Sequence, residues 1–354
     1  IETVASGVSR LNYPLIDGVV NGCPSHLLEP SRLQLIQYSE DFSQGYWLKP
    51  QASVVSGFTS PKGDLSAFKL VEDNSNNFHW LLQTTALSSS GVWSYSVFVK
   101  ASERSYVAIG NGSSAYYSFF DLQNGTVISS NANAIGSIQS FPNGWHKCTV
   151  ILTTTTAQAI GVHLSADGST ISYQGNGTSG VYIYGAQLEQ GSYPTSYIPN
   201  YGTSAGITRV AETANGAGDA TTFNDSEGVL MAEISALAND LTNRKLSISN
   251  GTSSQRIVLS YTTVSNTLDY DVVNSTQQVD ISHSLTDIKL FSKVAAKYKT
   301  NDFSLWVNGF EVKTGVIGNP PTGLSELNFD RGFGGENFYG NTKQIQYFDS
   351  ALND

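Results

Sequence analysis

The sequence is poor in charge. Lys, Arg, Asp and Glu make up 14% of its 354 residues, against about 25% in typical globular proteins. Ser, Thr, Asn and Gly take the place of the missing charge, and aromatic residues reach 11%. Long solvated helices rich in Lys and Glu are therefore not expected, and the aromatic content argues against disorder. The composition favours strands joined by tight turns.

Basic residues are fewer than acidic residues. The chain has 19 Lys and Arg against 29 Asp and Glu, so its net charge is -10. Nucleic acid binding requires a basic patch that releases phosphate counterions, and this balance disfavours it. No stretch approaches the roughly 20 apolar residues that a membrane span needs. We expect neither a nucleic acid partner nor membrane insertion.

Cysteines are few, and the sequence has no residue spacing typical of a catalytic or metal-binding site. Cys23 and Cys148 are the only cysteines, and no spacing supports a disulfide framework or a zinc site. We expect both to be unpaired, with Cys148 acting as a small buried hydrophobe in a strand. The five histidines fit no Ser/His/Asp or metal-binding pattern. We therefore expect no cofactor and no catalysis by this chain.

Short alternating segments fill the chain from residue 34 onward. Segments at 78–83, 93–100, 145–153 and 181–188 have strand periodicity, and Asn-Gly and Asp-Gly pairs separate the strands. This spacing predicts an antiparallel β-sandwich. Within 78–83, Phe78, Trp80 and Leu82 alternate with His79, Leu81 and Gln83, and we interpret the set with Trp80 as the core-facing one. Residues 303–312 predict a hairpin around Asn308-Gly309, with Trp306 on the face opposite the core.

The order of these signals predicts an all-β chain of two antiparallel sandwiches after an extended arm. Turn residues crowd residues 1–33, which we interpret as an N-terminal attachment arm. Residues 34–199 form the first predicted sandwich and residues 213–354 the second. Residues 200–212 link them, after Pro194 and Pro199 end the last strand of the first sandwich.

Five motifs resemble the receptor-binding spike, tail-fibre and head-fibre proteins of bacteriophages. They lie at residues 36–43, 95–106, 143–148, 185–199 and 208–212, and they are similar to a carbohydrate-binding-module-like jelly roll common in such proteins. Residues 226–230, 306–309 and 348–354 resemble a laminin G or concanavalin A-like sandwich. The same modules occur in some bacterial surface proteins and carbohydrate-active enzymes.

The resemblance implies a virion-surface, extracellular protein. It would attach a phage to its host by binding a cell-surface polysaccharide or another receptor. Residues 1–33 would bind other virion proteins, and the chain would form a homo-oligomer, either a trimer or a pentamer at a capsid vertex. Two alternatives stay open. One is a polysaccharide depolymerase, or the binding half of one, and the other is a purely structural capsid decoration or bacterial surface adhesin.

One face of the first sandwich offers a candidate sugar site. Sugar rings stack on aromatic side chains, while amides and charged groups bond the hydroxyls. If Trp80, Val97 and Val99 fill the core, a mixed polar and aromatic set shares the opposite face. This set is His79, Gln83, Phe98 and Lys100, joined by Lys147 and Tyr184 from other strands. The alternative is that this face packs against another domain or subunit.

Two further features are candidates for contacts. Trp306 lies beside a hairpin tip and would contact either ligand or a neighbouring subunit. Laminin G-like sandwiches hold calcium through rim Asp and Asn oxygens, which the resemblance extends to some turns of the second domain. The candidate calcium ligands are Asp219, Asn224 and Asp225, or Asn301 and Asp302. Ordinary turn chemistry is the alternative explanation, because Asp and Asn favour turns.

Overall fold

The described part of the protein is built from strands, as predicted. A computed structural model describes residues 8–83, 90–111, 116–154 and 159–352. Within these ranges the helical content is one 3-10 turn, η1 (Pro142–Gly144), and no helix is long and apolar enough to cross a membrane. Neighbouring strands pair in antiparallel fashion and build four larger sheets.

The chain divides into two compact units. Unit 1 contains Pro14–Gly22 and Ser31–Val210, and unit 2 contains residues 8–13, Cys23–Pro30 and 211–352. The N-terminal segment thus contributes strands to both units. In unit 1, β2 (Leu15–Ile16) pairs with β3 (Val19–Val20), while β1 (Leu11–Asn12) and β4 (Ser25–Leu28) extend a sheet of unit 2. The predicted attachment role of residues 1–33 stays a prediction.

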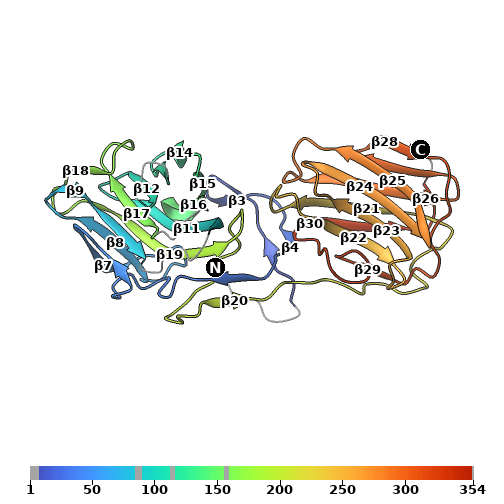
Figure 1. Cartoon of the computed structure of the whole chain (residues 1–354), viewed down its shortest axis with the longest axis horizontal. Helices are drawn as coiled ribbons and strands as arrows, with labels where there is room; N and C mark the ends of the chain where they lie inside the picture. The colour runs from blue at the N-terminus through green and yellow to red at the C-terminus, as the bar shows by residue number, and fades with distance from the viewer. Residues whose placement is uncertain (1–7, 84–89, 112–115, 155–158, 353–354) are drawn as a thin grey trace. The chain divides into compact units, whose positions relative to one another are not determined.

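Unit 1 is a sandwich of two six-stranded sheets (Figure 1). The first sheet has the order β14 (Thr126–Ser130), β13 (Tyr117–Asp121), β12 (Tyr106–Gly110), β17 (Gly161–Ser165), β10 (Trp80–Gln83) and β6 (Trp47–Leu48). The second has the order β15 (Ala134–Ser140), β16 (Trp145–Thr154), β11 (Gly91–Ala101), β19 (Gly180–Gln190), β8 (Ala67–Glu72) and β7 (Ala52–Phe58). Two small pairs complete the unit, β18 (Ser172–Gln174) with β9 (Asn76–Phe78) and β20 (Ile207–Arg209) with β5 (Arg32–Gln34).

Alternation along the central strands creates the core of unit 1. Tyr95, Val97 and Val99 of β11 are fully buried between the sheets, which meets the condition set for Val97 and Val99. Cys148 of β16 joins them, and burial raises the pKa of its thiol. Cys148 is buried and Cys23 is exposed, and both are free.

The predicted register of residues 78–83 was wrong. Leu81 is the residue of this segment that joins the core between the two sheets, while Trp80 is half-buried against the ring of His163, 4.7 Å away. The chain also changes partner at His79, since β9 pairs with β18 and β10 with β17. Apolar residues occupy both phases of this segment, so periodicity alone could not decide which phase faces inward.

The segment after β19 folds back as a cover. Residues 191–201, the exit strap, lie on the outer face of the second sheet. The Thr195 amide donates to Glu189 Oε2 at 2.9 Å, and the Ile198 amide donates to Gln187 Oε1 at 2.6 Å. The carboxylate and amide of β19 thus satisfy the backbone of a segment that its prolines exclude from a ladder.

Unit 2 is a sandwich of one seven-stranded and one five-stranded sheet (Figure 1). The larger has the order β1, β4, β30 (Gly340–Phe348), β21 (Glu227–Ala236), β26 (Ser292–Lys299), β27 (Phe303–Val307) and β28 (Phe310–Gly315). The smaller has the order β25 (Thr276–Ser284), β24 (Thr267–Asn274), β23 (Gln255–Tyr261), β22 (Arg244–Ser249) and β29 (Glu326–Asn328).

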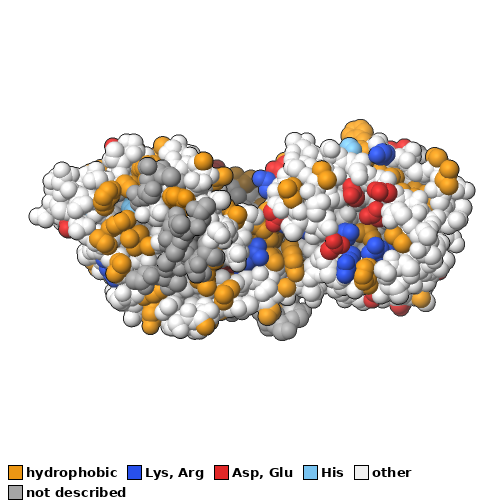
Figure 2. All heavy atoms as spheres, viewed as in Figure 1, with side chains coloured by type: hydrophobic (Ala, Val, Ile, Leu, Met, Phe, Trp, Pro, Cys, Tyr) orange, Lys and Arg blue, Asp and Glu red, His pale blue; other side chains and the backbone are white. Residues whose placement is uncertain are grey.

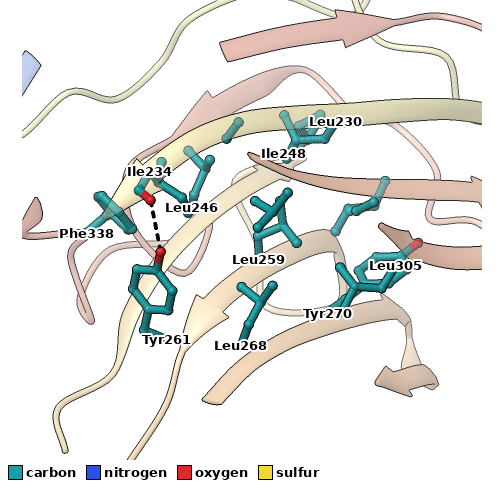
Figure 3. Packing of buried hydrophobic residues seen from close by; sticks show 14 of the residues in the cluster. Leu230, Ile234, Leu246, Ile248, Leu259, Tyr261, Leu268, Tyr270, Leu305 and Phe338 are labelled. Carbon is teal, nitrogen blue, oxygen red and sulfur yellow. Dashed lines mark hydrogen bonds between the residues drawn. The ribbon is translucent and has the colours of Figure 1, made fainter. Parts of the chain in front are cut away.

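Side chains from both sheets of unit 2 meet in one apolar core. Leu230 and Leu305 from the larger sheet pack with Ile248 and Leu259 from the smaller, as Figure 3 shows. The hydroxyl of the buried Tyr261 donates to the Ile234 carbonyl at 3.2 Å. This bond lets a large aromatic ring fill the core without leaving its polar end unpaired.

The hairpin predicted at residues 303–312 is confirmed. Asn308 and Gly309 have φ angles of 52° and 88°, the left-handed values that a two-residue type I′ turn requires. Phe303, Leu305 and Val307 face the core. Trp306 therefore points to the opposite face of the seven-stranded sheet.

A buried carboxylate ties β8 to two other segments of unit 1. Glu72 is 1% exposed and accepts bonds from Arg104 Nε and Nη2 at 2.8 and 2.7 Å. It also accepts from the Tyr173 hydroxyl at 2.6 Å and the Asn176 amide at 2.9 Å. Burial alone would raise the pKa of Glu72, but these donors outweigh burial and lower it.

We expect Glu72→Gln to destabilise unit 1 by about 3 kcal/mol at pH 7, because it leaves Arg104 without its counter-ion. A lowered folded-state pKa stabilises the fold above the ordinary pKa and ceases to do so as the pH falls, so the difference should shrink below about pH 4. Urea unfolding followed by tryptophan fluorescence measures it, since four of the five tryptophans lie in unit 1. Glu103→Gln, at an exposed pair with Lys69, is the control. A loss no larger than that of the control would contradict the assignment.

Candidate functional site

The predicted sugar-binding face of unit 1 exists but is covered. Phe98 lies opposite Lys147 on β16 and Tyr184 on β19, so the three share one face as predicted. Phe98 and Tyr184 are 3% and 0% exposed, because the Tyr197 ring of the exit strap packs on both. Lys147 Nζ donates to the Thr195 carbonyl at 3.1 Å. As ligand contacts these three predictions were wrong, since the face packs against the chain's own exit strap.

The predictions for His79 and Gln83 were also wrong. Both side chains are fully buried, and they do not lie on the sheet that carries Phe98. The His79 ring nitrogens bond the Gln51 carbonyl at 2.8 Å and the Tyr173 carbonyl at 3.2 Å. Gln83 Oε1 accepts from the Tyr46 hydroxyl at 3.4 Å. These groups hold neighbouring segments together and are not available to a ligand.

Lys100 lies two residues from Phe98 on β11 and shares its face as predicted, but it is half-buried and not fully covered. It lines a surface hollow of about 720 Å³ at the rim of unit 1, the rim hollow. The β2–β3 turn forms one wall, where Gly18 packs so closely that a Cβ would lie 2.5 Å from the Phe141 carbonyl oxygen. His146 also lines the hollow, and burial lowers the pKa of its imidazole.

The predicted calcium ligands serve turns. Asp219 accepts bonds from the Thr221 and Thr222 amides, and Asp225 accepts from the Gly323 and Leu324 amides. The others are engaged likewise: Asn224 bonds Ser226 and Asp349, Asn301 bonds Gly318, and Asp302 pairs with Lys297. In the described ranges, no three His, Cys, Asp or Glu side chains are grouped to hold a metal ion.

Trp306 lies in a hollow on the outer face of the seven-stranded sheet, the Trp306 hollow. Its volume is about 310 Å³, and Val229, Met231, Ala295 and Leu352 provide most of the apolar lining. The indole is half-buried, and its Nε1–H donates to Ser304 Oγ at 2.8 Å. Because Ser304 lies two residues back on the same face of β27, this bond holds the ring along the strand. The hollow combines a fixed aromatic ring with the size range of small-molecule sites.

The structure reveals a further polar surface on the five-stranded sheet. Asp269 and Asp271 of β24 and Asp280 of β25, together the carboxylate face, point away from the core. Figure 2 shows acidic and basic side chains gathered over β22–β25. Burial raises the pKa of Asp269 and Asp271, and the Asp280 charge raises both further. Sequence reasoning missed this set, although Asp269 and Asp271 are two residues apart and therefore share a strand face.

Cations flank the carboxylate face. The guanidinium groups of Arg256 and Arg331 lie 5.1 and 4.2 Å from the centre of the Phe333 ring. Lys245 pairs with Glu336 at 3.1 Å on the same side of the sheet. These contacts fix the loop at residues 331–336 beside the acidic residues.

The chain matches no protein-family model and no curated protein sequence. Among solved structures it is similar to domains LG4-5 of the mouse laminin alpha1 chain, at 12% sequence identity and a TM-score of 0.29. That match covers 98% of this chain and 96% of the laminin fragment. At this TM-score the overlap is too loose to bear on family or function. The description as two antiparallel β-sandwiches rests on the strand pairing and on the two cores.

We expect Asp271→Asn to raise the melting temperature of unit 2 by a few degrees at pH 7. A carboxyl with a raised folded-state pKa stabilises the fold below its ordinary pKa, and that contribution is lost as the pH rises through the folded value. Asparagine does not titrate and can still accept the Gln277 bond to Asp271. Differential scanning calorimetry from pH 7 to pH 3 should show the advantage disappearing as the wild-type carboxyl is protonated. A variant that is less stable than wild type at pH 7 would contradict this prediction.

Proposed function

We propose that this chain is a virion-surface spike or fibre protein of a bacteriophage that attaches to its host by binding a cell-surface glycan. The Trp306 hollow carries the proposal. Its indole is oriented by Ser304, is half-buried, and lines a hollow on the outer face of the seven-stranded sheet. The C–H faces of sugar rings bind such surfaces, because apolar contact and ring electrostatics act together.

The motifs that resemble phage receptor-binding proteins support the virion as the location. Strand-built units without long helices suit a protein that projects from a particle, and such proteins act as homo-oligomers. A single shallow sugar contact is weak, but several copies on one particle raise the overall affinity by orders of magnitude. The host receptor is the proposed partner, and residues 1–33 are proposed to bind other virion proteins.

Trp306→Ala should weaken binding to bacterial surface polysaccharide about 10-fold or more, which corresponds to about 1.4 kcal/mol. A glycan array of such polysaccharides, followed by adsorption to host cells, measures the loss. Phe310→Ala is the matched control, because Phe310 is 74% exposed on the same hairpin and does not line the hollow. Trp306→Tyr should retain part of the binding, since it preserves an aromatic face.

Equal binding by Trp306→Ala and wild type would overturn the assignment to this hollow. An array without hits, together with normal adsorption by particles that lack the chain, would favour the structural alternative of a capsid decoration or adhesin. Unchanged melting temperatures separate a lost contact from a lost fold.

Cleavage of the polysaccharide is the second candidate function, and the carboxylate face favours it. Glycoside hydrolysis needs two carboxyl groups, of which the acid has a raised pKa. The pKa of both Asp269 and Asp271 is raised, and Phe333 provides an aromatic surface nearby. A depolymerase would release reducing ends from host polysaccharide, and the double variant Asp269→Asn/Asp271→Asn would not. Binding without any release of reducing ends by wild type would reject this candidate.

A further inference from the structure

We propose that the Trp306 hollow binds a saccharide that carries a carboxylate, with Lys293 as its counter-ion. This inference rests on the proposed glycan-binding function and specifies its ligand class. The saccharide ring lies on the apolar surface around Trp306, and its charged substituent is directed toward the ammonium group of Lys293.

The charge of the lining is the first observation. The whole chain has a net charge of -10, yet the charged side chains that line the Trp306 hollow are Lys293 and Lys297, and no carboxylate lines it. A hollow lined by positive charge on a protein of negative net charge attracts anions and repels cations. An anionic ligand complements this lining, whereas a neutral ligand would not use its charge.

Three carboxylates on this side of unit 2 pair with lysines other than Lys293, and Glu311, opposite Trp306 on β28, does not line the hollow. Asp302 pairs with Lys297 at 3.1 Å, and Glu227 pairs with Lys299 at 3.0 Å. Glu233 faces Lys293 across the sheet, but its carboxylate lies 3.3 Å from Lys343 Nζ. Among described residues, Lys293 has no ion-pair partner. Its ammonium is therefore available to pair with a ligand carboxylate.

The backbone of Lys293 is held beside the indole. The Lys293 amide donates to Asn308 Oδ1 at 3.0 Å, and the Asn308 amide donates to the Lys293 carbonyl at 2.8 Å. Asn308 belongs to the type I′ turn that follows Trp306 on β27. Two bonds thus attach the start of the lysine side chain to the hairpin that carries the aromatic ring. Because the backbone of Lys293 is already held in place, less conformational entropy is lost when its ammonium group binds a ligand.

Apolar and charged contacts in the hollow then fit the two parts of an acidic sugar. Met231 and Ala295 lie next to Trp306 across β21 and β26 and supply the apolar part. A uronic acid unit presents C–H groups on one ring face and a carboxylate at its edge, which matches this division. The bond from an ammonium to a carboxylate is charge-assisted and stronger than a bond to a hydroxyl.

The test compares bacterial capsular polysaccharides rich in uronic acid in their native form and after chemical reduction of the carboxylates to alcohols. Wild type should bind the native form about 10-fold more tightly in low salt, and added salt should reduce the difference. Lys293→Gln should weaken native binding about 5- to 10-fold, bringing it close to that of the reduced form. Lys299→Gln is the control, because it removes the same charge from the same strand outside the hollow.

Several results would overturn the inference. If the native and reduced polysaccharides bind equally and Trp306→Ala abolishes the binding of both, the result supports glycan binding but contradicts a preference for acidic saccharides. Equal effects of Lys293→Gln and Lys299→Gln would reduce the role of Lys293 to general charge. If poly-glutamate displaces the polysaccharide completely at equal carboxylate concentration, the hollow selects charge and not sugar, which also rejects the inference. If no polysaccharide binds wild type, the proposed function falls as well.

Discussion

Every sheet in this protein depends on one constraint: a strand sends alternate side chains to opposite faces, and only one face can lie in the shared core. The core faces of the two units are alike, since both are filled by Leu, Ile, Val and Tyr. What differs is the treatment of the second face. In unit 1 the exit strap covers it, and in unit 2 the second face of the larger sheet keeps a half-buried tryptophan in a hollow.

The polar groups on the two outer faces find their hydrogen-bond partners in different ways. Glu189 and Gln187 are buried charged and polar groups, which is costly unless they are bonded. The backbone of the exit strap supplies those bonds, so the strap and the polar positions of β19 stabilise each other. The indole N–H of Trp306 also needs a hydrogen-bond partner, and Ser304 of the same strand provides it. The apolar ring of Trp306 then needs no cover from the chain, and it is the surface that we propose contacts a glycan.

The sequence was sufficient for the fold class, most strands, the type I′ turn and the outward direction of Trp306, because each depends on local periodicity or local φ preference. It was sufficient also for the shared face of Phe98, Lys147 and Tyr184. It could not show that residues 191–201 fold back over that face, because prolines exclude a strand without indicating where the chain goes. The phase of residues 78–83 was equally undetermined, since Leu81 and Trp80 are both apolar. The carboxylate face required knowledge of which strands are neighbours, which brings Asp280 opposite Asp271.

The carboxylate face and the Trp306 hollow lie on different sheets of unit 2 and differ in how their charges are arranged. On the five-stranded sheet, burial and the charge of Asp280 raise the pKa of Asp269 and Asp271, and flanking arginines stack on Phe333 without pairing with these carboxylates. On the seven-stranded sheet, Lys297, Lys299 and Lys343 each pair with a carboxylate, whereas Lys293 has no ion-pair partner among the described residues. An excess of like charge stores unfavourable energy that protonation relieves, whereas a single unpaired ammonium gains a partner only from outside the chain. The second arrangement is therefore the one that favours recognition of an anion.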